Sequence, residues 1–185
     1  MAITKKTFYG SGSIYEIEYD ESAVTIPTTQ TAVKSFAETY GIEDNQIGYL
    51  KGGFQVQLDA TKLEDQSDLG EMKVSLITKE EGKMIFKLFN ANGATISRLY
   101  PTAKTTDGIT VVGGLKGTEQ KEHIILFIAA DEAEGKTVFI AVGKNTTGFT
   151  LNWNPDSVEP FACEYSIIPY NTDGNLLVVA DLTKE

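Results

Sequence analysis

The sequence predicts a mainly β fold in which two antiparallel sheets pack as a sandwich or barrel, with one flanking α-helix and a long loop between strands. Runs of β-branched and aromatic residues succeed one another between Glu122 and Asp181, and Gly, Asn, Asp or Pro separates them. Period-two alternation near the start of the chain points the same way. A chain of 185 residues, 41% of them hydrophobic, is long enough for one sizeable core, so we expect one domain.

Residues 13–20 alternate between two kinds of side chain, which predicts a strand. We expect the apolar set in the core and the acidic set outside it. A solvated outer face is the usual interpretation of such an acidic row, although it would also suit the wall of a channel that passes polyanions without binding them. The apolar set is Tyr15, Ile17 and Tyr19, and the acidic set is Glu16, Glu18 and Asp20.

An amphipathic helix is predicted next. Thr28 and Thr29 are both candidate N-caps, and Gly41 stands where a helix-ending glycine is expected. Apolar side chains recur between them at helical spacing, at Ala32, Val33, Phe36, Ala37 and Tyr40.

The middle of the chain predicts further strands. Ile47 to Leu50 and Phe54 to Asp59 are expected to be separate strands on either side of a Lys-Gly-Gly turn. In the second strand, Phe54, Val56 and Leu58 should face inward, with Gln55, Gln57 and Asp59 facing outward. Residues 60–70 show no sustained period and are expected to form a long polar loop. Alternation returns at Met72, Val74 and Leu76, whereas Lys83 to Phe89 fits either a strand or a buried helical turn.

The remaining elements follow from turn chemistry and β propensity. Ala94 to Tyr100 predicts a short helix that ends before Pro101, and Ile109 to Val112 predicts a strand. In the last third, Asp173-Gly174 provides a hairpin turn that favours positive φ. The strands expected there are His123 to Ala130, Thr137 to Val142, Thr147 to Trp153, Pro160 to Ile168 and Leu176 to Ala180.

Charge and composition exclude several classes of protein. A net charge of −10 argues against a nucleic-acid-binding surface, since phosphate contacts are made mainly by Lys and Arg. The N-terminal residues lack the apolar run of a signal peptide, so we expect no export by that route. The longest apolar stretch, Ile124 to Ala130, is far shorter than the roughly 20 residues of a membrane-spanning helix, so we expect no membrane association.

Few residues are available for chemistry. The only histidine is His123 and the only cysteine is Cys163, so no nucleophile–base pair or His-cluster metal site can be assembled from them. Cys163 shares a face with apolar residues, which favours a buried, inert thiol. The acidic stretch Glu64, Asp65, Asp68 and Glu71 lacks the ligand spacing of an EF-hand. We therefore expect no enzyme, no cofactor and no metal site.

Three segments resemble the major tail tube proteins of long-tailed bacteriophages and of phage-tail-like particles. The resemblance covers most of the chain from about residue 9. It is carried by Tyr40 to Phe54 with the acidic stretch after it, by Asn90 to Gly93 with Leu99-Tyr100-Pro101, and by Phe161 to Pro169 with Asp173-Gly-Asn175.

The resemblance implies a structural virion protein. Residues 1–185 would be a single tail-tube domain with a flexible N-terminal segment, residues 1–12, and an extended loop, residues 60–70. Hexameric rings would stack into a tail tube that conducts DNA, and six copies at −10 give −60 for each ring. Glu16 and Glu18 would face the lumen. The loop that reaches the neighbouring ring would hold Leu63, Glu64, Asp65, Asp68 and Leu69.

The resemblance also implies the surroundings of the protein. Its partners would be further copies of itself together with tape-measure, tail terminator and distal tail proteins. DNA would pass through without specific binding, and no membrane would be bound. The protein would be made in the host bacterial cytoplasm and end in the virion tail.

Two other classes remain open from the sequence. One is the tube-forming ring protein of a bacterial secretion system, which shares this architecture. The other is a carbohydrate-binding β-sandwich, which requires exposed, coplanar aromatic side chains. The candidates for such a platform are Tyr9, Tyr15, Tyr49, Trp153 and Tyr170.

Overall fold

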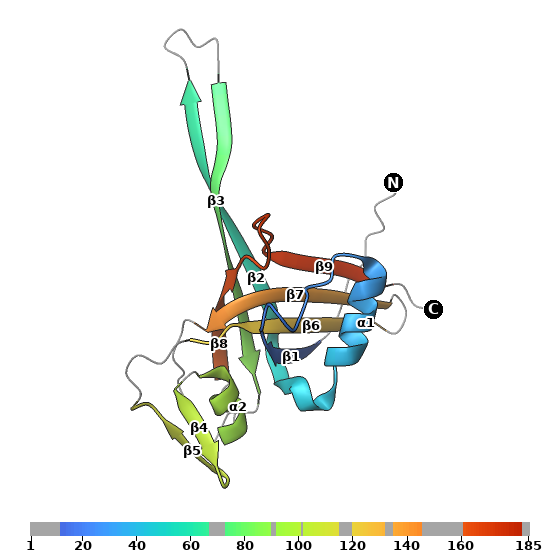
Figure 1. Cartoon of the computed structure of the whole chain (residues 1–185), viewed down its shortest axis with the longest axis vertical. Coiled ribbons are helices and arrows are strands. Elements are labelled where there is room, and N and C mark those ends of the chain that lie inside the picture. The colour runs from blue at the N-terminus through green and yellow to red at the C-terminus, as the bar shows by residue number, and fades with distance from the viewer. Residues whose placement is uncertain are drawn as a thin grey trace.

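A computed structural model of the chain describes residues 12–66, 73–89, 92–100, 102–114, 120–131, 135–145 and 161–182. Figure 1 shows a rounded body of strands with α1 packed on one side, and a long two-stranded hairpin that projects from it. The strands are β1 (Ser13–Glu18), β2 (Gln46–Gln66), β3 (Lys73–Leu88), β4 (Ala103–Thr106), β5 (Ile109–Val112), β6 (His123–Asp131), β7 (Gly135–Asn145), β8 (Phe161–Ile168) and β9 (Leu177–Leu182). The helices are α1 (Gln30–Tyr40), α2 (Gly93–Leu99) and a short 3₁₀ helix (Glu43–Asn45).

The main sheet closes on itself. Its strands follow the order β6-β1-β2-β3-β8-β7-β9, every pairing is antiparallel, and β7 also pairs with β6. Six strands therefore form a ring, and β9 extends the sheet from β7. The separate two-stranded sheet β4–β5 lies beside α2 (Figure 1). The predicted mainly β class is confirmed, with the pairing of a barrel.

Two hydrophobic clusters lie on opposite sides of the barrel wall. On β6, Ile125 and Phe127 point into the barrel, where they join Ile14, Met84, Phe86 and Tyr165. Ile124 and Leu126 of the same strand point outward, to the cluster that contains Val33 and Phe36 of α1. Both faces of β6, and of its neighbour β1, are thus covered by other parts of the chain.

Helix α1 forms where the sequence predicts it. The Thr29 hydroxyl accepts a hydrogen bond from the backbone N–H of Ala32 at 3.3 Å, which caps the first turn. Gly41 ends the helix with φ −78°, so the left-handed conformation is not the reason for glycine. A Cβ atom at Gly41 would lie 2.4 Å from the carbonyl oxygen of Ala37, so close approach of the backbone requires a residue without a side chain.

The expected Lys-Gly-Gly turn is not a turn. Strand β2 runs without a break through Gly52 and Gly53, which have φ of +93° and +89°. The register with β3 shifts between Leu50 and Phe54. The glycines therefore accommodate a bulge that bends one long strand, and the expectation of two separate strands was wrong.

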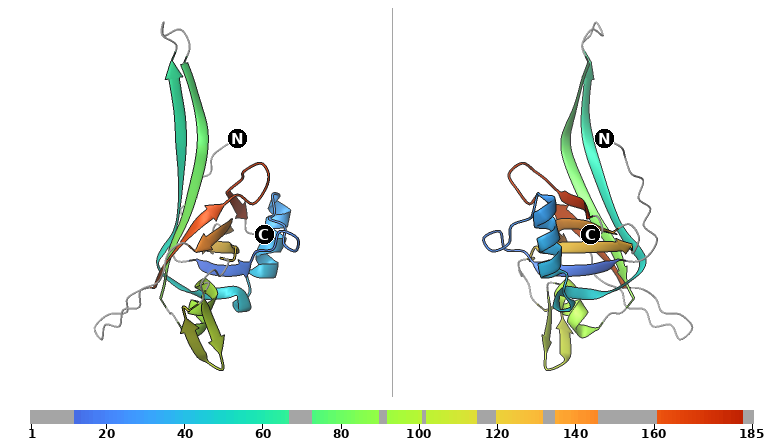
Figure 2. Two further views of the ribbon diagram at one scale, coloured as in Figure 1. Left: turned by 60° about the vertical axis from the view of Figure 1, so that its left-hand side comes forward. Right: turned by 90° about the vertical axis from the view of Figure 1, so that its right-hand side faces the viewer.

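The expected loop at residues 60–70 is largely strand. β2 continues to Gln66 and pairs with β3 down to Lys73, whereas the pairing of β3 with β8 begins only at Gly82. Beyond that point no third strand among the described residues pairs with them, and both views of Figure 2 show them projecting from the body. We call residues 58–65 and 74–81 the arm. Asp68 and Leu69 lie outside the described residues.

Most other expectations agree with the structure. Lys83 to Leu88 belongs to β3, which settles the choice between strand and helix, and α2 begins at Gly93 with Asn92 as its N-cap. Gly174 has φ +80° in the last turn, as expected. The expected strand Thr147 to Trp153 lies outside the described residues, as does most of the expected flexible segment 1–12.

Candidate functional site

The acidic row of β1 does not form one exposed face. Glu16 is only 3% exposed, so the expectation that it faces solvent or a lumen was wrong. The apolar set faces α1 as expected, but the opposite face of β1 points into the closed barrel. Glu18, next to the open end of β1, remains exposed, and its carboxylate lies 2.6 Å from the ammonium nitrogen of Lys121.

Glu16 sits among polar groups in the barrel interior. The Tyr165 hydroxyl donates a hydrogen bond to Glu16 Oε1 at 3.0 Å, and Nδ1 of His123 lies 3.0 Å from the same oxygen. Burial raises the pKa of Glu16 from 4.5 to about 7, against the opposing effects of the Tyr165 hydrogen bond and the positive charge of Arg98. Burial likewise lowers the pKa of His123. This cluster is a structural polar centre with an unusual proton affinity.

Replacing Glu16 with Gln should remove a pH-dependent part of the stability. The folded protein keeps a proton on Glu16 at pH values where the unfolded chain, with a pKa of 4.5, has lost it. The stability that this retained proton contributes is therefore fully present below pH 4.5 and is lost as the pH rises through about 7. The free energy of unfolding of Glu16→Gln, taken as a difference from that of wild type, should therefore rise by about 3 kcal/mol between pH 4.5 and pH 8.

Urea unfolding of both proteins at several pH values measures this difference, and His123 titrates in both. Glu18→Gln is the matched control because that carboxyl group is exposed. If the difference in unfolding free energy between Glu16→Gln and wild type stays constant with pH, the raised pKa of Glu16 is contradicted.

The arm exposes apolar side chains on both faces. Leu63 and Leu76 are cross-strand partners, and Val74 follows them on the same face. Ile77 pairs with Lys62 on the other face. The exposed fractions of Leu58, Leu63, Val74, Leu76 and Ile77 lie between 42% and 59%. An isolated two-stranded hairpin is marginally stable in water, so an arm of this composition is suited to being covered by another surface.

The arm is also acidic. It carries the carboxylates of Asp59, Glu64, Asp65, Glu80 and Glu81 against the ammonium groups of Lys62 and Lys79, a net charge of −3. Of the residues expected in the inter-ring loop, Leu63, Glu64 and Asp65 therefore lie on the arm. The return of alternation at Val74 and Leu76 was recognised in the sequence, but its pairing with residues 62–65, which makes those residues a strand, was missed.

An uncovered polar face lies on the outside of β2, β3 and β8. Gln55 and Gln57 point outward as expected. Across the strands, Gln55 is in line with Glu164, and Gln57 is in line with Lys83. Lys83 Nζ lies 2.9 Å from Glu164 Oε1, and Lys79 forms an ion pair with Glu81. We call Gln55, Gln57, Lys83, Lys87, Glu164 and Ser166 the polar sheet face. The apolar Ile85 lies on the same side of the sheet, between Gln55 and Glu164. The polar sheet face carries two lysines and one carboxylate, unlike the purely acidic row that the sequence suggested.

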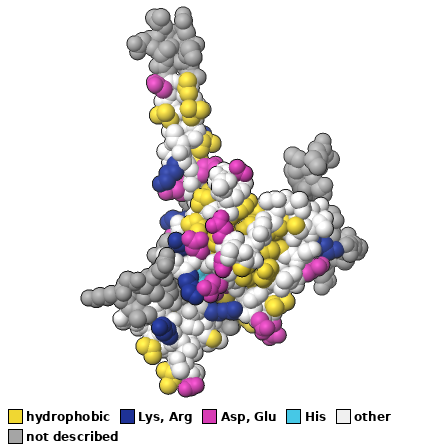
Figure 3. All heavy atoms as spheres, in the orientation of Figure 1, with side chains coloured by type: hydrophobic (Ala, Val, Ile, Leu, Met, Phe, Trp, Pro, Cys, Tyr) yellow, Lys and Arg dark blue, Asp and Glu magenta, His cyan; other side chains and the backbone are white. Residues whose placement is uncertain are grey.

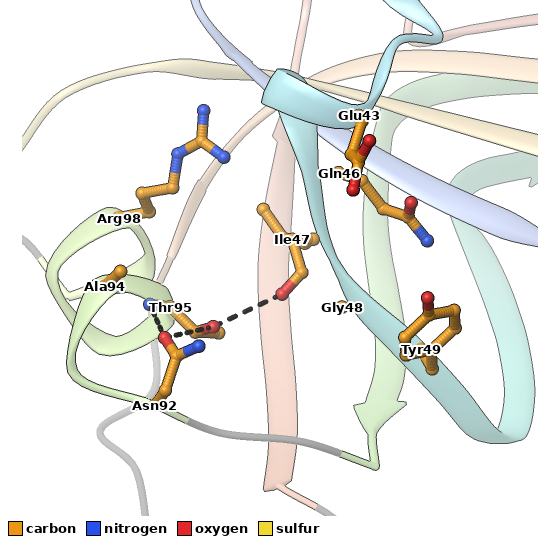
Figure 4. A pocket seen from close by; sticks show the side chains of 9 residues that line it. All are labelled: Glu43, Gln46, Ile47, Gly48, Tyr49, Asn92, Ala94, Thr95 and Arg98. Atoms are coloured by element: carbon orange, nitrogen blue, oxygen red, sulfur yellow. Dashed lines mark hydrogen bonds between the residues drawn. The ribbon is translucent and has the colours of Figure 1, made fainter.

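The surface of the described residues also has hollows. Figure 4 shows the first, of about 260 Å³, with Arg98 and Glu43 on different sides of it. Asn92 there accepts from the backbone N–H of Thr95 at 2.8 Å, so its side chain serves as the cap of α2. The second, of about 440 Å³, is lined by residues that include Tyr19, Glu122 and Tyr170. In the first hollow the Thr95 hydroxyl donates to Asn92 Oδ1 at 3.1 Å, so it too belongs to the cap of α2.

The other sequence candidates are placed as follows. Cys163 is buried, and burial raises the pKa of its thiol well above the usual range. Among the described residues, no three His, Cys, Asp or Glu side chains form a group that could hold a metal ion. Tyr49 is 68% exposed, whereas Tyr15 and Tyr170 pack into the cluster beneath α1. These three tyrosines do not form a common platform, and Tyr9 and Trp153 lie outside the described residues.

Comparisons with known proteins give a structural likeness but no match in sequence. No family model and no curated protein matches the chain. A chain in the cryo-EM structure of the anti-feeding prophage baseplate, six-fold symmetrised, is similar over 96% of this chain and 97% of its own length. The sequence identity is 6% and the TM-score is 0.45, so we draw no conclusion about function from it. Within the described part of the chain, no helix is both long and apolar enough to cross a membrane.

Proposed function

We propose that this chain is a structural protein that assembles into hexameric rings, which stack into a phage-type tail tube through which DNA passes. The observation that carries the proposal is the arm, which leaves the barrel with apolar side chains on both faces and, within the described part of the chain, pairs with no third strand. The tube itself is inferred from the segments that resemble tail tube proteins, such as Tyr40 to Phe54 and Phe161 to Pro169.

Docking of the arm on another copy would contribute useful free energy. Full burial of a Leu, Ile or Val side chain stabilises by about 1.5–3 kcal/mol, and the five apolar side chains of the arm are already about half buried. Covering the remainder is worth on the order of 5 kcal/mol for each arm, before the entropic cost of association. One arm would therefore bind weakly, whereas six arms in each ring would bind strongly.

The polar sheet face is the surface we assign to the bore. Helix α1 occupies another side of the barrel, over β6 and β7, so β2, β3 and β8 are left uncovered (Figure 2). Duplex DNA is held when lysines are free to contact phosphate. On this face Lys83 is paired with Glu164, which reduces the attraction of that lysine for phosphate and leaves Lys87 as the second cation of the wall. Glu18, the exposed member of the β1 row, is the alternative bore residue.

The proposed role is architectural, with no catalytic step, cofactor or metal. The partners are further copies of the chain, together with tape-measure, tail terminator and distal tail proteins. The site of action is the virion tail, and membrane binding forms no part of the proposal. A ring protein of a secretion system would use the same arm, so genes for tape-measure and terminator proteins beside this one would favour the tail.

Shortening the arm should abolish stacking without unfolding the barrel. Thr61 and Lys79 are cross-strand partners, so residues 62–78 can be replaced by Asn-Gly, which closes a two-residue hairpin. The variant should keep its thermal transition, because the deleted residues do not pair with the barrel. Negative-stain electron microscopy of concentrated protein should show tubes for wild type and none for the variant. Tubes formed without the arm would refute the assignment.

Freeing a lysine on the bore wall should make the tube retain DNA. Glu164→Gln removes the partner of Lys83, and Glu18→Gln removes the partner of Lys121, so the two variants form a matched pair. Tubes of Glu164→Gln should retain duplex DNA at low salt and release it as salt rises, while Glu18→Gln tubes behave as wild type. Retention can be measured by co-sedimentation. If Glu18→Gln tubes retain DNA and Glu164→Gln tubes do not, the bore is lined by the β1 side instead.

A further inference from the structure

We propose that the arm of one copy docks on the opposite end of a second copy, where β5 and the junction of β2 with β3 expose apolar side chains. We call Tyr49, Phe89, Ile109 and Val111 the receiving end. This inference deepens the proposed function, since it names the surface that receives the arm. It rests on the distribution of exposed apolar side chains, on charge and on the position of the two surfaces.

The large exposed apolar side chains of the described residues gather at two ends of the molecule. Five are on the arm, as given above. The four of the receiving end are 48% to 68% exposed, and Val112 follows them on β5. Ile42, beside the 3₁₀ helix, and Val179, on β9, belong to neither set. Figure 3 shows hydrophobic side chains along the arm and again at the β4–β5 end. Exposed apolar patches of this kind mark interaction surfaces.

The β4–β5 hairpin is built to present its apolar face outward. Thr105 and Thr110 are cross-strand partners, their hydroxyl oxygens lie 2.8 Å apart, and they face Gly93 at the start of α2. A Cβ atom at Gly93 would lie 2.2 Å from the Thr110 hydroxyl oxygen, so the hairpin is seated closely on the helix. The alternate residues, Ile109 and Val111, therefore point away from the body.

The charges of the two surfaces are complementary. Around the receiving end lie three cations, Lys51 over the Phe89 ring, Arg98 and Lys104, and two carboxylates, Glu43 in the hollow beside Tyr49 and Asp107, a net charge of +1. The arm carries −3. Lys104 is the cross-strand partner of Val111, so a cation lies directly beside the apolar face. An acidic arm should therefore prefer the basic receiving end to the arm of another copy, because two acidic arms repel each other.

The position of the two surfaces determines the kind of assembly. The arm and the β4–β5 hairpin lie at opposite ends of the longest axis of the molecule (Figure 1). A contact between different surfaces on identical chains is heterologous, and it continues indefinitely unless a rotation closes it. With the surfaces at opposite ends, each copy receives one arm and provides another, which extends the stack in the direction of the arm.

Mixing two cysteine variants tests the pairing of the surfaces. Leu76→Cys places a thiol on the arm and Val111→Cys places one on the receiving end, while the native Cys163 is buried and unreactive. A short bismaleimide should give a cross-linked dimer when the two variants are mixed and none when either is treated alone. Val179→Cys mixed with Leu76→Cys is the matched control, since Val179 is also about half exposed and belongs to neither surface.

A dimer from Leu76→Cys alone would indicate arm-to-arm pairing and would overturn the inference, as would equal yields with Val111→Cys and Val179→Cys. Assembly gives an independent measurement. Val111→Glu should lose tubes in electron micrographs, whereas Val179→Glu should keep them, with thermal transitions unchanged in both. If wild type and both variants form tubes, the assignment of the receiving end is wrong but the proposed tube function is retained. If the cross-link forms but wild type never forms tubes, the proposed function is wrong and the pairing stands.

Discussion

The structure depends on the closure of its main sheet through β7. This strand pairs with β6 along one edge, and its other edge is divided between β9 and β8. Closure converts the inner face of every barrel strand into core, including that of β1, and leaves the outer faces to be covered separately. Helix α1 covers β6 and β7, whereas the outer face of β2, β3 and β8 stays polar and open. The division of the surface into a covered side and an open side follows from this single topological fact.

Closure also explains why an acidic residue lies in the core. Glu16 faces inward at a position where β1 passes Tyr165 of β8 and His123 of β6. A buried carboxyl group is tolerable only with a hydrogen-bond partner, which the Tyr165 hydroxyl provides. The hydrogen bond from Tyr165 joins strands that are not neighbours in the sheet. A polar contact across the barrel is directional, so it favours one arrangement of the strands over apolar packing that tolerates several.

The sequence predicts the elements of this fold better than their surroundings. Alternation correctly separated Phe54 and Val56 from Gln55 and Gln57, and the pattern of Val33 and Phe36 located the buried face of α1. Alternation reports two faces, however, and cannot tell that both are buried, which is why Glu16 was assigned to solvent. The arm was missed for a related reason. Its two faces are both mixed, so residues 60–66 show no period, and only their pairing with Val74 to Ile77 makes them a strand.

The composition of the arm fits a protein that must stay soluble before it assembles. Its apolar side chains are interleaved with carboxylates and only about half exposed, which limits the free energy that any one docking event can provide. In the proposed ring six such contacts form together, and the cost of orienting the partner is paid once for all of them. Weak single contacts and strong collective ones keep free copies apart, yet favour their addition to a stack that already presents six receiving ends. An arm with a wholly apolar face would lose this distinction, because two free copies would then bind each other as readily as a growing tube.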